Sequence, residues 1–276
     1  KGEKTYMDWN KTKSIFIIIF LLLNTFLGYQ LYQQKNENKI EILEQSSVEK
    51  KLADLNIKYG KIPDKSDKQS YISGQSELFM ESELKKLPAQ KIEIIDQTSV
   101  VSVLEKPVFL PKVTLKESVQ EFLKEYVLYG KEYGFLEVDE KEEVITCFEK
   151  HNGHPIFDNQ KAVVKLFLNE KNEVIGYEQT YLFITTQGSK KEIIQPLKVL
   201  ERLVEYNELP YNSRVETIEF GYYSLPDLTG DVQVLAPTWH VVVKREKEED
   251  KHFYINAIDG DMLDEPVEGE AAAFVK

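Results

Sequence analysis

The chain has 276 residues and a formal net charge of −12 at pH 7, with 42% hydrophobic and 11% aromatic residues. This acidic balance argues against nucleic-acid binding, which needs a basic surface to neutralise phosphates, and against a domain that lies on anionic lipid. The single cysteine, Cys147, excludes an intramolecular disulfide. A domain outside the cell would therefore depend on its packed core for stability.

An apolar stretch runs from Ile15 to Leu31, and the polar residues Asn24 and Thr25 interrupt it near its middle. As a helix, this run and its edges reach roughly 25–30 Å, about the thickness of one hydrocarbon core. The pattern predicts a transmembrane helix over residues 14–32. The alternative is a cleaved signal peptide, which fits less well because no A-x-A-like cleavage site follows.

The flanks of this span predict its orientation. Lys11 and Lys13 directly precede it, and positively charged residues favour the cytoplasmic side. Aromatic residues suited to the two membrane interfaces lie at its ends: Trp9, Tyr29 and Tyr32. We expect residues 1–13 to form a cytoplasmic tail, of which residues 1–6 are an upstream extension before Met7, and the bulk of the chain to lie outside.

Asn24 is the most informative residue within the span. An amide at membrane depth seeks a hydrogen-bond partner, typically on another helix, and Gly28 lies one turn later on the same face, where it permits close approach. The predicted partner-binding residues are Phe20, Asn24, Gly28 and Leu31. Such a contact is worth about 0.6–2 kcal/mol. The alternative is that Asn24 bonds within its own helix or to lipid headgroups.

Residues 33–45 are polar and predict a juxtamembrane stalk or a continuation of the helix. Ser46-x-x-Glu49 reads as a capping box that opens a short helix, which Gly60 and Pro63 end. Further segments are expected as follows: a loop over 61–75, an ambiguous segment over 77–87, a strand over 91–104 and a linker at Pro107 and Pro111.

Two helices with an apolar stripe predict the cores of two α+β units. The first opens at the capping box Thr114-x-x-Glu117 and stops at Gly130 or Gly134, and the second begins at Pro196 and stops before Pro210. Strands are expected over 135–148, 162–169, 173–186, 214–223, 238–245 and 252–258, with a hairpin turn at 170–172. Asp259-Gly260 predicts a tight turn into Met262-Leu263, and the tail from Glu265 is acidic.

Residues 114–186 and 195–264 share one order of elements: helix, strand, long connection, hairpin. This repetition predicts an α+β fold of repeated helix-plus-antiparallel-sheet units after the transmembrane helix. The expected units are residues 46–112, 113–194 and 195–276, which follow the tail (1–13), the transmembrane helix (14–32) and the stalk (33–45).

Three residue groups invite a chemical interpretation. Cys147, His151 and His154, with Asp158 nearby, resemble a metal set, but no second ligand pair appears, so a buried strand cysteine before a polar loop is the preferred interpretation. Ser47-x-x-Lys50 and Ser82-x-x-Lys85 match S-x-x-K, yet the S-D-N-like and K-T-G elements that such enzymes also need are missing from the sequence.

His240 and His252 flank a predicted hairpin and are expected to be cross-strand neighbours, most simply at solvent-facing positions, although a pH sensor is conceivable. None of these groups forms a catalytic set, so we predict that the protein is not an enzyme and uses no cofactor or metal.

Both ends of the chain carry sequence that resembles one known family. Met7–Lys13 (MDWNKTK) running into SIFIIIFLLLN resembles the amino terminus of the YycI family. The stretches PTWHV (237–241) and FYINA (253–257), followed by Asp259-Gly260, resemble the last unit of YycI and YycH proteins and, more loosely, PepSY-type domains. The residues expected to define the fold of this unit are Trp239, Tyr254, Asn256, Ala257, Asp259 and Gly260.

The resemblance implies a membrane-anchored accessory regulator of the sensor histidine kinase WalK (YycG), which controls cell-wall metabolism in Gram-positive bacteria. It would act with YycH through transmembrane helix contacts and inhibit the kinase, and a homodimer is a further expected assembly. The alternative is an extracytoplasmic PepSY-like module that binds a peptidase or cell-wall ligand, with the span as a passive tether. A surface enzyme would need converging titratable groups.

Overall fold

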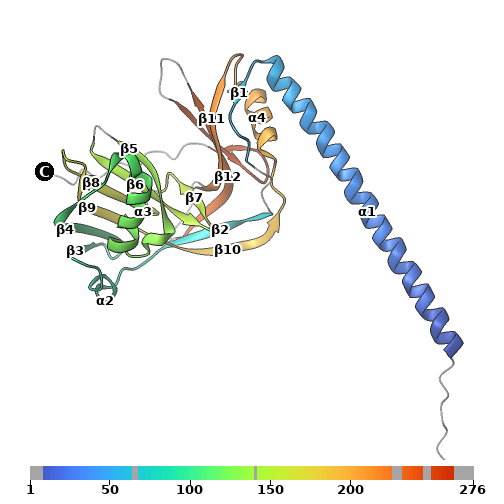
Figure 1. Cartoon of the computed structure of the whole chain (residues 1–276), viewed down its shortest axis with the longest axis horizontal. Helices are drawn as coiled ribbons and strands as arrows, with labels where there is room; N and C mark the ends of the chain where they lie inside the picture. The colour runs from blue at the N-terminus through green and yellow to red at the C-terminus, as the bar shows by residue number, and fades with distance from the viewer. Residues whose placement is uncertain (1–8, 64–67, 140–141, 226–231, 245–249, 264–276) are drawn as a thin grey trace, which may run out of the picture. The chain divides into compact units, whose positions relative to one another are not determined.

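A computed structural model describes residues 9–63, 68–139, 142–225, 232–244 and 250–263. The chain divides into two compact units, Lys1–Asn56 and Ile57–Lys276, whose elements are labelled in Figure 1. The expected extension over residues 1–6 and the acidic tail from Glu265 lie outside the described residues. The predicted α+β class, with one amino-terminal apolar helix and a sheet-rich region, is confirmed.

The first unit contains one helix, α1 (Trp9–Asp54), which is 46 residues long. It continues through residues 33–45, so of the two predictions for the stalk the helical continuation is confirmed. The prediction of a separate helix that opens at Ser46 is wrong, because Ser46 and Glu49 lie inside α1. No glycine or proline occurs between Gly28 and Gly60 to interrupt it. The chain leaves the helix at Asn56, whose φ is +51°.

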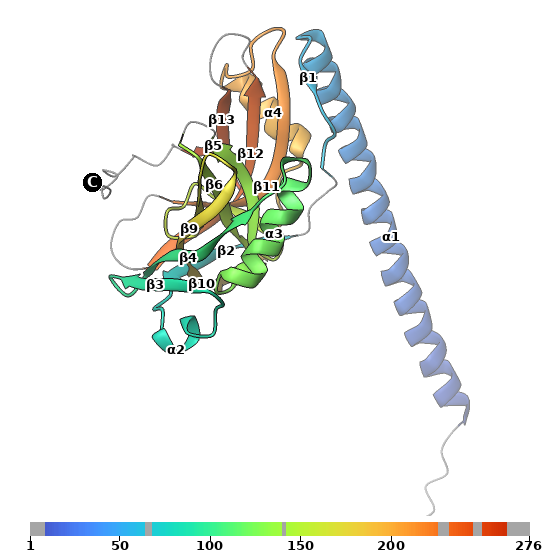
Figure 2. The same ribbon diagram turned by 60° about the vertical axis from the view of Figure 1, so that its left-hand side comes forward.

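In the second unit, six antiparallel neighbours form a sheet that we call the α3 sheet. Its strands, in spatial order, are β3 (Gln90–Ile95), β4 (Ser99–Phe109), β9 (Glu173–Thr180), β8 (Val163–Leu168), β6 (Val144–His151) and β5 (Tyr133–Asp139). Helix α3 (Leu115–Tyr126) lies against one face of it (Figures 1 and 2). The buried core between them includes Val100, Val119, Phe122, Leu123, Ile145, Leu166 and Tyr177.

The predicted apolar stripe of α3 is confirmed, but the helix ends at Tyr126, before the predicted stop at Gly130 or Gly134. Its first residue follows Thr114, whose side chain makes no capping hydrogen bond. After Tyr126 the chain turns back, and a Cβ on Gly130 would lie 1.7 Å from the backbone oxygen of Leu123. Gly130 is therefore needed for a close approach of backbones. Short 3-10 turns flank the helix, η1 (Lys112–Thr114) and η2 (Gly130–Glu132).

A second sheet, which we call the α4 sheet, contains strands from distant parts of the sequence. Its order is β10 (Leu182–Lys191), β2 (Gln69–Ser76), β12 (Val232–Lys244) and β11 (Arg214–Ser224). β13 (Lys251–Asn256) pairs with the second half of β12, β14 (Met262–Leu263) with β13, and β1 (Lys58–Tyr59) with β11. Helix α4 (Pro196–Glu205), predicted from Pro196, lies beside β11 and β12 in both views (Figures 1 and 2).

A short strand, β7 (His154–Phe157), links the two sheets. It pairs antiparallel with β6 of the α3 sheet and parallel with β11 of the α4 sheet. β7 and β11 approach each other closely at one glycine. At Gly221 in β11, a Cβ would lie 2.4 Å from both the Phe157 ring and the Pro155 carbonyl oxygen.

Several predicted strands have different boundaries in the structure. The loop predicted over 61–75 contains β2, and the ambiguous segment 77–87 contains the short helix α2 (Glu81–Leu84). The single strands predicted over 91–104 and 135–148 are the hairpins β3–β4 and β5–β6, and the strand over 173–186 divides at Tyr181 into β9 and β10. The hairpin turn at 170–172 is confirmed, with Asn172 at φ +57°.

The linker predicted at Pro107 is also wrong, because Pro107 lies inside β4, where the β4–β9 register shifts between Val103 and Val108. A bulge tolerates a residue that has no backbone N–H. The division into units 46–112, 113–194 and 195–276 stays a prediction. Neighbouring strands of the α4 sheet (β2, β10 and β12) come from these three stretches.

Candidate functional site

The first candidate site is the apolar part of α1. Among the described residues, Lys13–Leu31 is the segment long and apolar enough to cross a membrane: it has 19 residues, and a window of 18 of them has a mean hydropathy of 2.0. As a helix it spans about 28 Å, close to the thickness of a hydrocarbon core. Every side chain in it is exposed within the chain, and Phe16 and Leu31 are each 68% exposed. These properties indicate a single-pass membrane anchor.

The predicted partner-binding residues Phe20, Asn24, Gly28 and Leu31 share one face of α1, because they follow each other at intervals of three and four residues. The Asn24 side-chain amide donates a hydrogen bond to the Phe20 carbonyl oxygen at 2.9 Å. The bond within its own helix is thus present. The side-chain oxygen of Asn24 is still able to accept a hydrogen bond from another helix. A Cβ on Gly28 would meet nothing within 4 Å. A partner role for this face stays a prediction.

The second candidate is the carboxyl-terminal motif, which forms a tight network around the β13–β14 turn. The Asn256 amide donates to an Asp259 carboxylate oxygen at 3.0 Å and to the Tyr71 hydroxyl at 3.1 Å, and its Oδ1 accepts the Ile258 N–H at 2.9 Å. Gly260 has φ +81°, which favours glycine at this turn.

Two further members of this motif connect it to the segment before α4. The indole N–H of Trp239, which is 1% exposed, donates to the Ile194 carbonyl oxygen at 3.0 Å. The Ile194 N–H in turn donates to the Ala257 carbonyl oxygen at 2.7 Å. The contacts of the motif residues are thus with other parts of the same unit, so this arrangement can position secondary structure.

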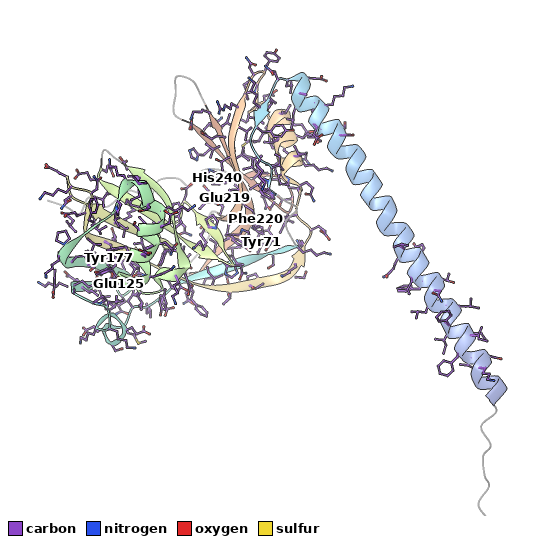
Figure 3. All side chains as sticks on the ribbon, in the orientation of Figure 1. Tyr71, Glu125, Tyr177, Glu219, Phe220 and His240 are labelled. Atoms are coloured by element: carbon purple, nitrogen blue, oxygen red, sulfur yellow. The ribbon has the colours of Figure 1, made fainter. Side chains whose placement is uncertain are left out.

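Tyr254, the remaining motif residue, belongs to a row of stacked rings. This row lies on the face of β12 and β13 opposite to the Trp239 side chain. The Tyr254 ring centroid lies 4.3 Å from that of Tyr223 and 4.7 Å from that of His240, and the Tyr254 hydroxyl donates to Asp158. His240 in turn stacks on His252 at 5.1 Å. His240 is labelled in Figure 3, near Glu219 of the neighbouring strand. The two histidines are therefore neighbours, as predicted.

The expectation that both histidines face solvent is wrong for His240, which is 8% exposed. Phe157 covers it, with the ring centroids 4.9 Å apart. Burial, and secondarily His252, lowers the pKa of His240 to about 3. Because this imidazole is neutral at ordinary pH, it packs as an aromatic ring.

The cysteine and the other two histidines do not converge. Cys147 is buried in β6, and burial raises the pKa of its thiol to about 12. The rings of His151 and His154 pack on Tyr222 and Phe220, with centroids 5.6 and 4.8 Å apart. Across the described residues, no three or more His, Cys, Asp or Glu side chains form a group that could hold a metal ion. Of the S-x-x-K pairs, Lys85 forms its ion pair with Glu81, at 2.9 Å.

A buried carboxyl group that sequence reasoning missed lies where the chain crosses between the sheets. Glu149 is 1% exposed and accepts the Leu182 N–H at 2.8 Å, and burial raises its pKa to about 8. Beside it, the Tyr133 hydroxyl donates to the Thr180 carbonyl oxygen, and the Gln179 amide donates to the Leu128 carbonyl oxygen at 2.6 Å. The available signal was the spacing of the strand VITCFEKH, in which Glu149 falls on the same face as the apolar residues Ile145 and Cys147.

Comparison with known proteins adds a family. No curated protein matches the chain. Among solved structures, an uncharacterized protein from Eubacterium rectale ATCC 33656 aligns with a TM-score of 0.48 and 11% identity over 76% of this chain and 91% of its own. The Bacillus megaterium YpeB C-terminal domain aligns with a TM-score of 0.41 and 15% identity over 68% of this chain and 100% of its own. Neither informs the function at these values.

The family model described as "YycI protein" matches residues 36–258, which is most of the chain and includes nearly all of the second unit. The sequence resemblance that the two ends of the chain suggested is thereby confirmed at the level of the family. This chain belongs to the YycI protein family.

Proposed function

We propose that this protein is a membrane-anchored accessory regulator that inhibits the sensor histidine kinase WalK (YycG), acting with YycH through contacts between transmembrane helices. Membership of the YycI family supports a role in this two-component system. The single observation on which the proposal rests most is the exposed apolar helix with a polar amide at its middle. We place the amino terminus in the cytoplasm, from Lys11 and Lys13, and the second unit outside.

The mechanism is a shift in the population of two kinase arrangements. A helix that packs better against one arrangement raises its population, and only this difference in binding free energy has an effect. The Asn24 amide and the small Gly28 supply a hydrogen bond and close packing on one face of α1. A differential contact of about 0.6–2 kcal/mol changes the ratio of the two arrangements about 3- to 30-fold.

Co-purification of the full chain with the kinase from membranes tests this proposal. We expect Asn24→Leu to lower kinase recovery, and replacement of residues 14–32 by an unrelated span to abolish it. Thr25→Leu is the matched control, because Thr25 bonds within α1 to the Leu21 carbonyl oxygen at 2.8 Å and lies next to Asn24 on a different face.

Kinase activity measured in the same membranes tests whether the protein inhibits or activates the kinase. For an inhibitor, we expect the activity to rise when residues 14–32 are replaced. If recovery of the kinase is unchanged by the span replacement while the second unit stays folded, the proposed helix contact is wrong. The passive-tether alternative, in which the outer unit binds a peptidase or cell-wall ligand, would then take its place.

A further inference from the structure

A cavity of about 300 Å³ lies beside the point where the chain crosses from the α3 sheet to the α4 sheet. Its wall includes Ser99, Lys161, Lys165, Glu178 and Thr180, and Val163 is its apolar member. This volume is at the lower end of the range of small-molecule sites, about 300–1,000 Å³. All but one of the lining residues have polar side chains, so the wall offers hydrogen bonds, while the aliphatic parts of the side chains also give it apolar surface. This lining favours a ligand with several hydrogen-bonding groups on a carbon skeleton.

The strand register explains how these side chains come together. Lys165 of β8 lies directly opposite Glu178 of β9, and Ser99 of β4 lies opposite Thr180 of β9. Their chain neighbours Leu166 and Tyr177 are buried in the core beneath α3. Because successive side chains in a strand point to opposite faces, the cavity lies on the face of the α3 sheet that α3 does not cover.

The rim of the cavity is held by hydrogen bonds. The Thr180 hydroxyl donates to the Gln160 carbonyl oxygen at 2.8 Å and accepts the Val163 N–H at 3.1 Å. The Lys161 N–H donates to the Asn159 side-chain oxygen at 2.9 Å. These bonds fix the loop from which Lys161 reaches the cavity, so the site is formed before any ligand arrives.

The charges at the wall point to an anion. Lys161 and Lys165 contribute two positive charges and Glu178 one negative charge, which leaves a local excess of one positive charge on a chain whose net charge is −12. In the part of the chain that the structure describes, neither lysine has a carboxylate within ion-pair distance, although Glu178 is opposite Lys165 in the register. An excess of one charge suits a monoanion better than a phosphate dianion.

We propose that this cavity binds a hydroxylated monocarboxylate of monosaccharide size, such as a sugar acid. The ligand carboxylate would lie between the ammonium groups of Lys161 and Lys165. Its hydroxyl groups would donate to the Glu178 carboxylate and exchange hydrogen bonds with Ser99. This site is independent of the apolar helix, so its failure and the failure of the kinase proposal are separate results.

Isothermal titration of the detergent-solubilised full chain with D-glucuronate tests the proposal. Glucose, which lacks the carboxylate, and glucosamine, which carries the opposite charge, are the matched ligands. We expect glucuronate to bind with a dissociation constant of about 1 mM or lower, and glucose and glucosamine to bind about tenfold more weakly. Raising the salt concentration should weaken glucuronate binding.

Three variants locate the site. Lys165→Met should weaken glucuronate binding about tenfold, whereas Glu178→Gln should keep or raise the affinity, because it removes a negative charge from the wall. Lys171→Met is the control: it makes the same charge change at an exposed position in the β8–β9 turn. Thermal unfolding curves verify that each variant is folded.

Three outcomes would overturn the proposal. The first is no detectable heat of binding with glucuronate at about 10 mM. The second is equal binding of glucuronate and glucose. The third is an equal loss of binding in Lys165→Met and Lys171→Met, which would mean that only the general charge of the protein matters.

Discussion

His240 Nε2 lies 2.9 Å from His252 Nδ1, so one hydrogen bond joins the two imidazoles of β12 and β13. Such a bond requires one ring to accept through an unprotonated nitrogen. Protonating both rings would place two N–H donors against each other. His240 is also covered by the rings of Phe157 and Tyr254, so protonating it would bury a charge. Glu219 lies opposite His240 in the β11–β12 register and would favour the protonated form, but burial is the larger effect and lowers the pKa of His240.

We therefore expect His240 to lower the stability of the protein in acid. Its pKa falls from 6.5 to about 3 on folding, so below pH 6.5 the unfolded chain binds a proton that the folded chain does not. The stability that neutral His240 contributes is fully present above pH 6.5. As the pH falls below 6.5, the free energy of unfolding decreases by about 1.4 kcal/mol per pH unit. His240→Phe keeps a stacking ring but removes the titration. Urea unfolding at pH 7 and pH 5 should show a smaller loss in this variant than in the wild type, and equal losses would contradict the assignment.

Glu149 should have the opposite pH dependence. Its pKa rises from 4.5 to about 8 on folding, so between these values the unfolded chain has lost a proton that the folded chain keeps. Stability contributed by this group is present below pH 4.5 and falls as the pH rises towards 8. Glu149→Gln removes the titration and keeps an oxygen for the Leu182 N–H. The stability of the variant relative to wild type should rise between pH 5 and pH 8.

A matched control separates this effect from a general change in charge. Glu125 is exposed on α3 and is labelled in Figure 3. Glu125→Gln makes the same substitution where water solvates the carboxyl group in the folded state as well. Its stability difference from wild type should change less between pH 5 and pH 8 than that of Glu149→Gln, and a change as large as that of Glu149→Gln would refute the prediction.

Asn256 should contribute more to folding than an ordinary turn residue. Asn256→Ala removes the bonds to Tyr71, Asp259 and the Ile258 N–H, and we expect a loss of about 1–3 kcal/mol in the free energy of unfolding. Asn256→Asp keeps an acceptor for the Ile258 N–H but places a second carboxylate beside Asp259. It should be destabilised less at pH 4 than at pH 7. If Asn256→Ala unfolds like the wild type, the motif does not define the fold of this unit.

The link between the sheets through β7 is tested at Gly221. A Cβ there would lie 2.4 Å from the Phe157 ring and from the Pro155 carbonyl oxygen, so Gly221→Ala should lower the free energy of unfolding by about 1–3 kcal/mol. Gly60→Ala is the control, because its Cβ would meet its nearest neighbour, the Glu216 carbonyl oxygen, at 3.6 Å. Its effect should stay within about 0.5 kcal/mol. Equal denaturation midpoints for the two variants would argue against a close β7–β11 approach.

Several elements could be predicted from the sequence because their signals are local. The apolar run around Ile15–Leu31 and the stripes of α3 and α4 reflect side chains that recur at the helical period, which needs no knowledge of distant residues. The turn at 170–172 likewise joins strands that are adjacent in sequence. The ends of the chain also contained enough specific residues to suggest the family.

Other features were decided by tertiary structure. β2 (QSYISGQS) has the composition of a loop, and it is a strand because β10 and β12, more than 100 residues away, bond both of its edges. The carboxyl of Glu149 and the cavity wall at Lys165 and Glu178 acquire their environments in the same way. A local pattern states which residues can form a strand, but hydrogen bonds from distant strands determine its neighbours, its burial and the chemistry of its side chains.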